Sequence, residues 1–326
     1  MKKLLLFLFS GILSVILYEY FLQFSPFKFG LSPVKYDDKI GMWHKENYSD
    51  YKIDKCYKVK YFLDNKGLPK NILNYNKNLK DIIIIGDSYV EAFMVENTNI
   101  VHNSLSKLYK DKFNFLNYGL SGTSPTQQYV ILKEKVDLNR TSVVLQFINE
   151  GDLMDTDAKY FDNLARPKVH LDFIDFDNFK IIPPRTETIY DKLGDLLGNF
   201  ELYTYIKKGI YFFRNNFSIK EETILFKEQK NEEINLSKNW LNLKGAIYQT
   251  KILLNQNNIK YKIILDFKDD TKNQIIANFL NEKNIDFIDI VRDVDFELKS
   301  FECDGHWNDE THRNIANTIF KNNFLK

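Results

Sequence analysis

Four consecutive isoleucines at positions 82–85 stand directly before Gly86, Asp87 and Ser88. A strand with one face in water alternates apolar and polar residues, whereas a strand covered on both faces is apolar throughout. The run therefore predicts a strand inside a parallel sheet, with helices packed on both sides. Because glycine tolerates a tight turn, we expect the chain to bend at Gly86 and Ser88 to open the following helix.

Strand-like and helix-like segments alternate along the rest of the chain. Further strands are expected at 113–117, 142–148, 260–266 and 286–290, and helices at about 98–110, 125–137, 238–257, 271–283 and 309–322. Strands that alternate with helices are joined by right-handed crossovers. The pattern predicts an α/β fold, a three-layer α/β/α sandwich around about five parallel strands.

Two segments depart from this alternation. Residues 156–235 are rich in aromatic side chains and too long for a simple loop, so we expect an inserted subdomain or lid, with a helical stretch at 202–216 packed on the domain or on a membrane surface. Residues 28–80 show alternation at 57–64 and form a lead-in segment or a hairpin. The catalytic domain is then expected over 81–326.

Composition excludes several classes of protein. The 45 Lys and Arg residues balance the 44 Asp and Glu residues, so no global field exists to collect nucleic acid. The two cysteines, Cys56 and Cys303, are too few for a four-thiolate zinc site. They can form one bridge in an oxidising compartment, and the sequence leaves that pairing open. We expect neither a metal nor a cofactor.

The N-terminus predicts the compartment. Lys2 and Lys3 precede an uncharged run at 4–18, which Glu19 interrupts before apolar residues continue to Phe24. No small-x-small cleavage site follows, so residues 1–27 are interpreted as an uncleaved signal anchor or transmembrane segment, with secretion after cleavage as the alternative. Lysines remain in the cytoplasm, so the body is expected outside the cytoplasmic membrane, in the periplasm or beyond.

Residues suited to one reaction follow several of the expected strands. Ser88 follows the first strand, Gly119 the second and Asn149 the third, while Asp304 and His306 precede the last helix. In open parallel sheets, sites form beyond the carboxyl ends of the strands. A serine, a histidine and a carboxylate are the parts of a nucleophilic acyl-transfer site.

Three segments resemble the first, second and fifth sequence blocks of the SGNH/GDSL hydrolase superfamily: DIIIIGDSYVEAF, NYGLSGTSPTQQY and DGHWNDETHRNIA. The resemblance covers 81–155 and 260–325. It implies a flavodoxin-like α/β/α domain with Ser88 as nucleophile, His306 as base and Asp304 as its orienting partner. It also implies an oxyanion hole made by the N–H groups of Ser88 and Gly119 and by an asparagine side chain.

The chain departs from the family pattern at the asparagine. The third block usually reads Gly-x-Asn-Asp, and alignment on Asp152 puts Gly151 where the asparagine belongs. Asn149 lies two residues earlier, so Asn149 and Gly151 both stand as candidates for the oxyanion hole.

A second departure concerns the histidine. The family often spaces its pair as Asp-x-x-His, whereas Asp304 and His306 are one residue closer. His312 has the literal spacing from Asp309. We choose His306 because the His-Trp-Asn stretch before a helix matches the usual catalytic position.

These features predict a membrane-anchored serine enzyme that removes or transfers acyl groups, such as acetyl, on an envelope or surface glycan. Water as the acceptor makes it an esterase, and a sugar hydroxyl makes it an O-acyltransferase. The alternative from another class is a degenerate relative that binds glycan or a partner without turnover. The acyl group and the oligomeric state are left open.

Overall fold

The computed structural model describes residues 2–24, 31–156, 167–206, 210 and 232–325. Its central sheet contains five parallel strands: β5 (Asp81–Ile85), β6 (Asn114–Asn117), β7 (Thr141–Asn149), β10 (Lys260–Asp266) and β11 (Asp286–Asp289). The spatial order is β11-β10-β7-β5-β6. Counted along the chain, this is the flavodoxin-like order 2-1-3-4-5. The predicted five-stranded parallel sheet is confirmed.

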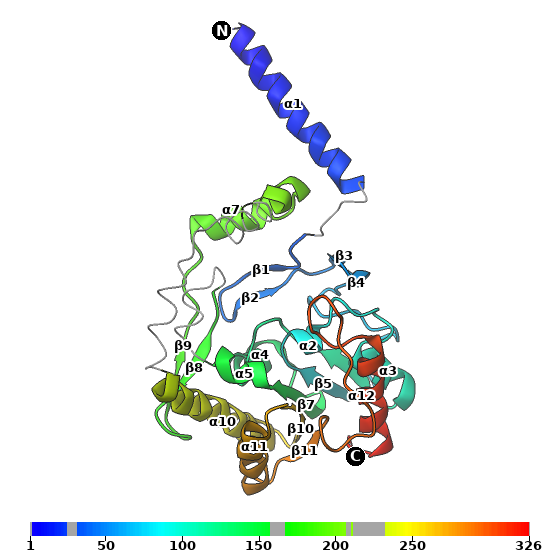
Figure 1. Cartoon of the computed structure of the whole chain (residues 1–326), viewed down its shortest axis with the longest axis vertical. Helices are drawn as coiled ribbons and strands as arrows, with labels where there is room; N and C mark the ends of the chain where they lie inside the picture. Colours follow the sequence, from blue (N-terminus) through cyan, green and yellow to red (C-terminus); the bar gives the residue numbers. More distant parts are fainter. Residues whose placement is uncertain (1, 25–30, 157–166, 207–209, 211–231, 326) are drawn as a thin grey trace.

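Helices cover both faces of the sheet (Figure 1). Helices α4 (Pro125–Lys135), α10 (Glu232–Gln256) and α11 (Asp270–Glu282) pack on one face, and α3 (Val101–Tyr109) and α12 (Asp309–Lys321) on the other. The isoleucines of β5 alternate between the layers: Ile83 and Ile85 join the first core, and Ile82 and Ile84 the second. All four are at most 1% exposed, which confirms the two-sided burial.

Residues 31–80 form two antiparallel hairpins, which we call the lead-in. The first pairs β1 (Val34–Asp37) with β2 (Gly41–His44), and the second pairs β3 (Ser49–Asp54) with β4 (Tyr57–Phe62). Burial alternates along β4, and its buried side chains pack on residues 92–95 just after the short helix α2 (Ser88–Glu91). The lead-in is therefore built directly against the segment that carries Ser88.

The insertion after β7 and α5 (Glu150–Asp155) contributes to one core layer. Its hairpin of β8 (His170–Phe173) and β9 (Phe179–Ile182) places Leu171 and Phe173 in the core beside α10. Helix α7 (Ile189–Leu197) follows, and residues 201–206 are helical. Most of the remaining insertion, including much of the helical stretch predicted at 202–216, lies outside the described residues.

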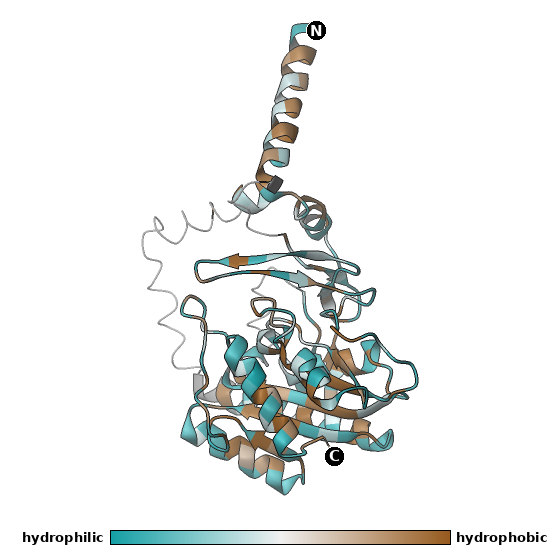
Figure 2. Cartoon of the chain, turned by 90° about the vertical axis from the view of Figure 1, so that its right-hand side faces the viewer, coloured by the Kyte–Doolittle hydropathy of each residue, from teal (hydrophilic) through white to brown (hydrophobic). Residues whose placement is uncertain are grey.

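Helix α1 (Lys2–Phe24) extends away from the body and is predominantly hydrophobic along its length (Figures 1 and 2). Its segment Leu5–Leu22 is long and apolar enough to cross a membrane, and 18 residues at helical rise span about 27 Å. Phe7, Phe9 and Ile12 are each more than half exposed, so the body does not cover this part of the helix, whereas Glu19 and Leu22 near its end are buried. The predicted apolar N-terminal helix is present.

Candidate active site

The strand order reverses between β5 and β7, and Ser88 lies at this point. Open α/β sheets bind ligands where neighbouring connections leave in opposite directions. Asp87 caps α2 by accepting a hydrogen bond from the Tyr89 N–H (2.9 Å), and Ser88 is the first residue of the helix. The Ser88 N–H is one of the first-turn groups that have no partner inside the helix.

His306 reaches Ser88 from the opposite end of the sequence. Its Nε2 lies 2.8 Å from Ser88 Oγ, across a separation of 218 residues. The loop that carries His306 is held by an antiparallel bridge between Ser300 and Trp307. The Trp307 indole N–H donates to Asp266 at the end of β10 (3.2 Å), so the sheet itself fixes this loop.

Asp304 lies beside His306, as the sequence predicts. Its Oδ1 accepts the His306 backbone N–H (3.0 Å) and lies 3.4 Å from His306 Nδ1. Its Oδ2 accepts a hydrogen bond from the hydroxyl of Tyr57 on β4 (2.8 Å). The ring contact is longer than a hydrogen bond, but catalytic contacts often tighten only when substrate is bound.

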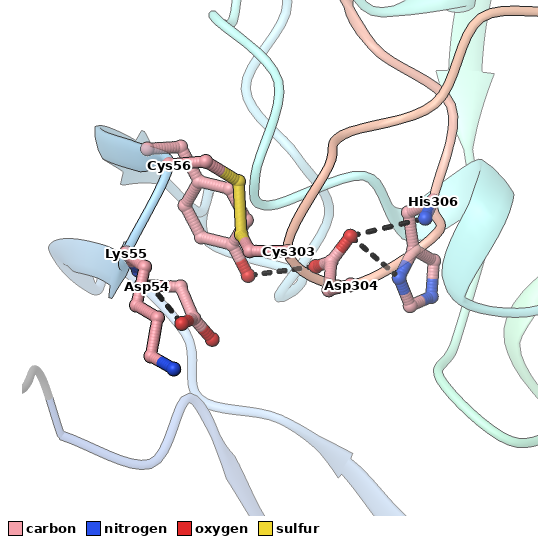
Figure 3. The surroundings of a disulfide bond; sticks show 7 residues. Asp54, Lys55, Cys56, Cys303, Asp304 and His306 are labelled. Atoms are coloured by element: carbon pink, nitrogen blue, oxygen red, sulfur yellow. Dashed lines mark hydrogen bonds and ion pairs between the residues drawn. A yellow bond between two sulfur atoms is a disulfide. The ribbon is translucent and has the colours of Figure 1, made fainter.

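A disulfide joins the lead-in to this loop. Cys56 bonds Cys303, with Cα atoms 5.9 Å apart, and Figure 3 shows the bond beside Asp304 and His306. Sequence reasoning left this pairing open and missed Tyr57. The signal was nevertheless present, because Tyr57 follows Cys56 just as Asp304 follows Cys303, so pairing the cysteines brings those neighbours together.

Asn149 contacts the turn that carries Ser88. Its Nδ2 donates to Asp87 Oδ2 (2.8 Å), and its Oδ1 accepts the Gly151 N–H (2.8 Å) as the N-cap of α5. An amide carries two hydrogens on Nδ2, so one is left for a ligand. Asn149 thereby contacts the residue that directly precedes Ser88.

Two of the predicted oxyanion donors are occupied in the structure. The Gly119 N–H donates to Asn117 Oδ1 (2.8 Å) inside its own loop, and the Gly151 N–H donates to Asn149. Both N–H groups therefore already have an acceptor within their own loops. Gly119 has a packing reason instead, since a Cβ there would lie 2.3 Å from the Glu91 nitrogen.

His312 lies away from Ser88, in a fully buried position on α12 that is 1% exposed. Burial lowers the pKa of His312 to about 3, and the nearby His102 and His306 add to this effect. The histidine that contacts the serine is His306, despite its shorter spacing from the aspartate.

A second contact links the lead-in to the loop after β6. Buried His44 on β2 lies 2.7 Å from Glu91 through Nε2, and Glu91 also accepts the hydroxyl and N–H of Ser121. Burial alone would raise the Glu91 pKa, but the hydrogen bonds from His44 and Ser121 outweigh it and lower the pKa. Glu91 thus fixes α2 to its neighbours on both sides.

The carboxyl groups beneath the serine are poorly solvated. Burial raises the pKa of Asp87 to about 6, although hydrogen bonds from Asn149 and from the Tyr89 N–H oppose the shift. Burial, with the Asp87 charge second, also raises the pKa of Asp152. Within the described residues, no three His, Cys, Asp or Glu side chains gather as metal ligands would.

No family model matches the chain, and no curated protein resembles it. Among solved structures, it is similar to a lipolytic protein of the G-D-S-L family from Desulfitobacterium hafniense (12% identity, TM-score 0.41, covering 74% of this chain and 98% of that one). An acylhydrolase from Bacteroides fragilis gives 13% identity and a TM-score of 0.39 (78% and 92% covered).

A catalytic mutant of an acetylxylan esterase from Geobacillus stearothermophilus gives 9% identity and a TM-score of 0.39 (74% and 93% covered). With identities and scores this low, the chemistry of the site has to be argued from the chain's own residues.

Replacing Asp87 with Asn tests the buried charge. The folded-state pKa of Asp87, about 6, exceeds the unfolded value near 3.8, so the wild type loses stability as pH rises through this window. The variant carries no such charge. Its melting temperature relative to wild type should therefore rise between pH 4 and pH 6 and stay level above, measured by thermal unfolding. A difference that is flat or falls across the window would contradict the raised pKa.

Proposed function

We propose that this protein is a serine-dependent acyl-ester hydrolase that works outside the cytoplasmic membrane. The observation that carries the proposal is the 2.8 Å contact between Ser88 Oγ and His306 Nε2 at the switch point of the sheet. A serine is a weak nucleophile at neutral pH until a positioned base takes its proton. The sequence blocks around these residues further support a place in the SGNH/GDSL superfamily.

In the proposed reaction, Ser88 Oγ attacks the acyl carbonyl carbon while His306 Nε2 accepts the serine proton. Collapse of the tetrahedral intermediate breaks the ester bond, and His306 returns the proton to the leaving alcohol. Water then gives its proton to His306 and attacks the acyl-serine, which releases the acid and restores the serine. Asp304 stabilises the imidazolium and holds the ring.

We assign the oxyanion hole to the Ser88 N–H and to the second amide hydrogen of Asn149. The first belongs to a helix N-terminus, where backbone N–H groups and the helix dipole both favour negative charge. The second is left over after Asn149 donates to Asp87. Asn149 also weakens the case for a degenerate, non-catalytic relative, which rested on Gly151 standing in the asparagine's place.

Hydrolysis is preferred over transfer because the site is open to water. The His306 side chain is 26% exposed, so water can reach the base once the acyl-serine has formed. An O-acyltransferase with a sugar-hydroxyl acceptor remains the alternative. We propose an acylated envelope or surface glycan as substrate. The basis is the apolar run of α1: the two lysines before it favour a cytoplasmic N-terminus, so the rest of the chain would lie outside the membrane, where such glycans are found.

Ser88→Ala and His306→Ala should each abolish detectable turnover of a chromogenic acetyl ester, because neither group works without the other. The purified full chain is assayed with and without oligosaccharide acceptors, which separates hydrolysis from transfer. His312→Gln is the matched control and should keep activity. Wild-type turnover by Ser88→Ala would refute the serine mechanism. Activity lost in His312→Gln but kept in His306→Ala would mean that His312, and not His306, is the base.

Asn149→Ala should lower kcat about 10²-fold with little change in KM, as expected when one oxyanion donor is lost. The substitution also removes a helix cap, which costs about 1 kcal/mol of stability. Asp269→Ala removes the comparable cap of α11, where Asp269 accepts the Lys272 N–H, and provides the control. Equal kinetics for the two variants would mean that Asn149 only caps its helix.

Tyr57 is proposed as a positioning residue that acts through Asp304. Its hydroxyl holds the carboxylate oxygen that does not face the imidazole, so the other oxygen is kept beside His306. The ring is buried against Phe301 in the disulfide loop, with centroids 5.2 Å apart, and remains in place if only the hydroxyl is removed.

Tyr57→Phe should reduce kcat/KM about tenfold, well short of the loss from removing a triad member. Without the Tyr57 donor, Asp304 carries more charge toward His306, so the acidic limb of the pH profile of kcat/KM should move to higher pH. Tyr51→Phe on the neighbouring strand is the control. An unmoved pH profile in Tyr57→Phe would leave the hydroxyl a purely structural role.

A further inference from the structure

Helix α7 presents its polar side to the body. Asp195 Oδ2 accepts the Tyr36 N–H of β1 (3.3 Å), and Asp191 pairs with Arg185 while it caps the helix with Thr188. A surface helix of a soluble domain does the opposite, because it buries its apolar stripe and turns its charges to water. The apolar side of α7 is therefore turned away from the body, as in helices whose outer side is covered by something other than water.

The opposite side of α7 is apolar, and the residues that the structure describes leave it exposed. Ile189, Leu193 and Leu196 follow the i, i+4, i+7 pattern of one helix stripe, and they are 69%, 46% and 59% exposed. Exposed apolar side chains continue past the helix. We call this set the outer apolar face; it comprises Ile189, Leu193, Leu196, Leu197, Phe200 and Ile206. Exposed large apolar side chains gathered along one segment are typical of an interaction site.

The outer apolar face lies beside the end of α1. Glu19, the acidic residue within the apolar run, accepts the backbone N–H groups of Glu201 (2.8 Å) and Leu202 (2.9 Å). Its carboxylate thereby caps the first turn of the helical residues 201–206, a favourable place for negative charge. Figures 1 and 2 both place this part of the body next to the end of α1.

The position of Glu19 along α1 indicates the level of the outer apolar face relative to a membrane. Glu19 lies one turn before the end of the candidate span Leu5–Leu22, and Tyr18 and Tyr20 flank it. Tyrosines gather at the level of lipid headgroups, and a span of this length ends there. The body residues that Glu19 holds, and the outer apolar face next to them, are consequently at the same level.

We propose that the outer apolar face is embedded in the lipid surface beside α1, so that the body is held against the membrane at two places. The proposal rests on the proposed membrane location of the protein. A single helix would let the body swing and rotate, whereas a second contact fixes its orientation. It also restricts the substrate to acyl groups carried close to the membrane surface.

The test uses the intact chain in vesicles of phosphatidylcholine and phosphatidylglycerol. Both native cysteines are bonded to each other, so Leu196→Cys introduces the one free thiol for an environment-sensitive fluorophore. We expect blue-shifted emission and loss of most of the fluorescence when the vesicles contain nitroxide-labelled lipid. Glu282→Cys on α11, at the opposite end of the body in Figure 1, is the control and should give water-like, unquenched emission.

The outcomes separate the two proposals. Water-like emission at Leu196 in chains that are intact and embedded in vesicles would overturn the lipid contact and leave the anchor standing. Blue-shifted emission without lipid quenching would show that protein, including a second copy, covers the face instead. Chains that lose residues 1–24, measured by mass spectrometry, or fail to enter vesicles would refute the membrane location itself. Leu193→Cys repeats the measurement one turn away.

Discussion

The burial of β5 on both faces is the constraint from which the site follows. Because every isoleucine of the strand is covered, β5 has to lie inside the sheet, and its carboxyl end has to open at the point where the connections diverge. That end carries Gly86, Asp87 and Ser88. Ser88, the proposed nucleophile, is therefore positioned by apolar packing that extends through both layers of the molecule, and polar contacts only refine its surroundings.

The lead-in supplies those refinements from outside the sheet. One hairpin reaches Glu91 through His44, and the other reaches Asp304 through Tyr57 and through the disulfide. One contact is to the helix that carries Ser88, and the other is to the loop that carries His306. A segment that could be taken for a spacer between membrane and domain thus forms part of the wall of the site.

The sequence predicts the sheet well because the signal is local: apolar runs of strand length, rich in β-branched residues and separated by longer helical stretches, favour buried parallel strands. Ser88 follows such a run, and Asp304 and His306 precede a recognisable helix, so the sequence brings all three forward as candidates. The partners of the candidate oxyanion donors are not predictable in this way, because the N–H groups of Gly119 and Gly151 each donate a hydrogen bond inside their own loops. Tyr57 escapes prediction because its partner is 247 residues away.

The disulfide gives the protein an order of maturation. Cys56 and Cys303 are 247 residues apart and enclose most of the chain. Closing a loop of that length lowers the entropy of the unfolded chain and thereby stabilises the folded protein by about 5 kcal/mol. In an exported chain, Ser88 leaves the cytoplasm long before the segment that carries its base. Ser88 and His306 cannot meet in such a chain until the C-terminal segment has crossed the membrane. The disulfide between Cys56 and Cys303 can form only after that step. For the proposed ester hydrolase, synthesis in the cytoplasm and activity outside it would then be separated in both time and compartment.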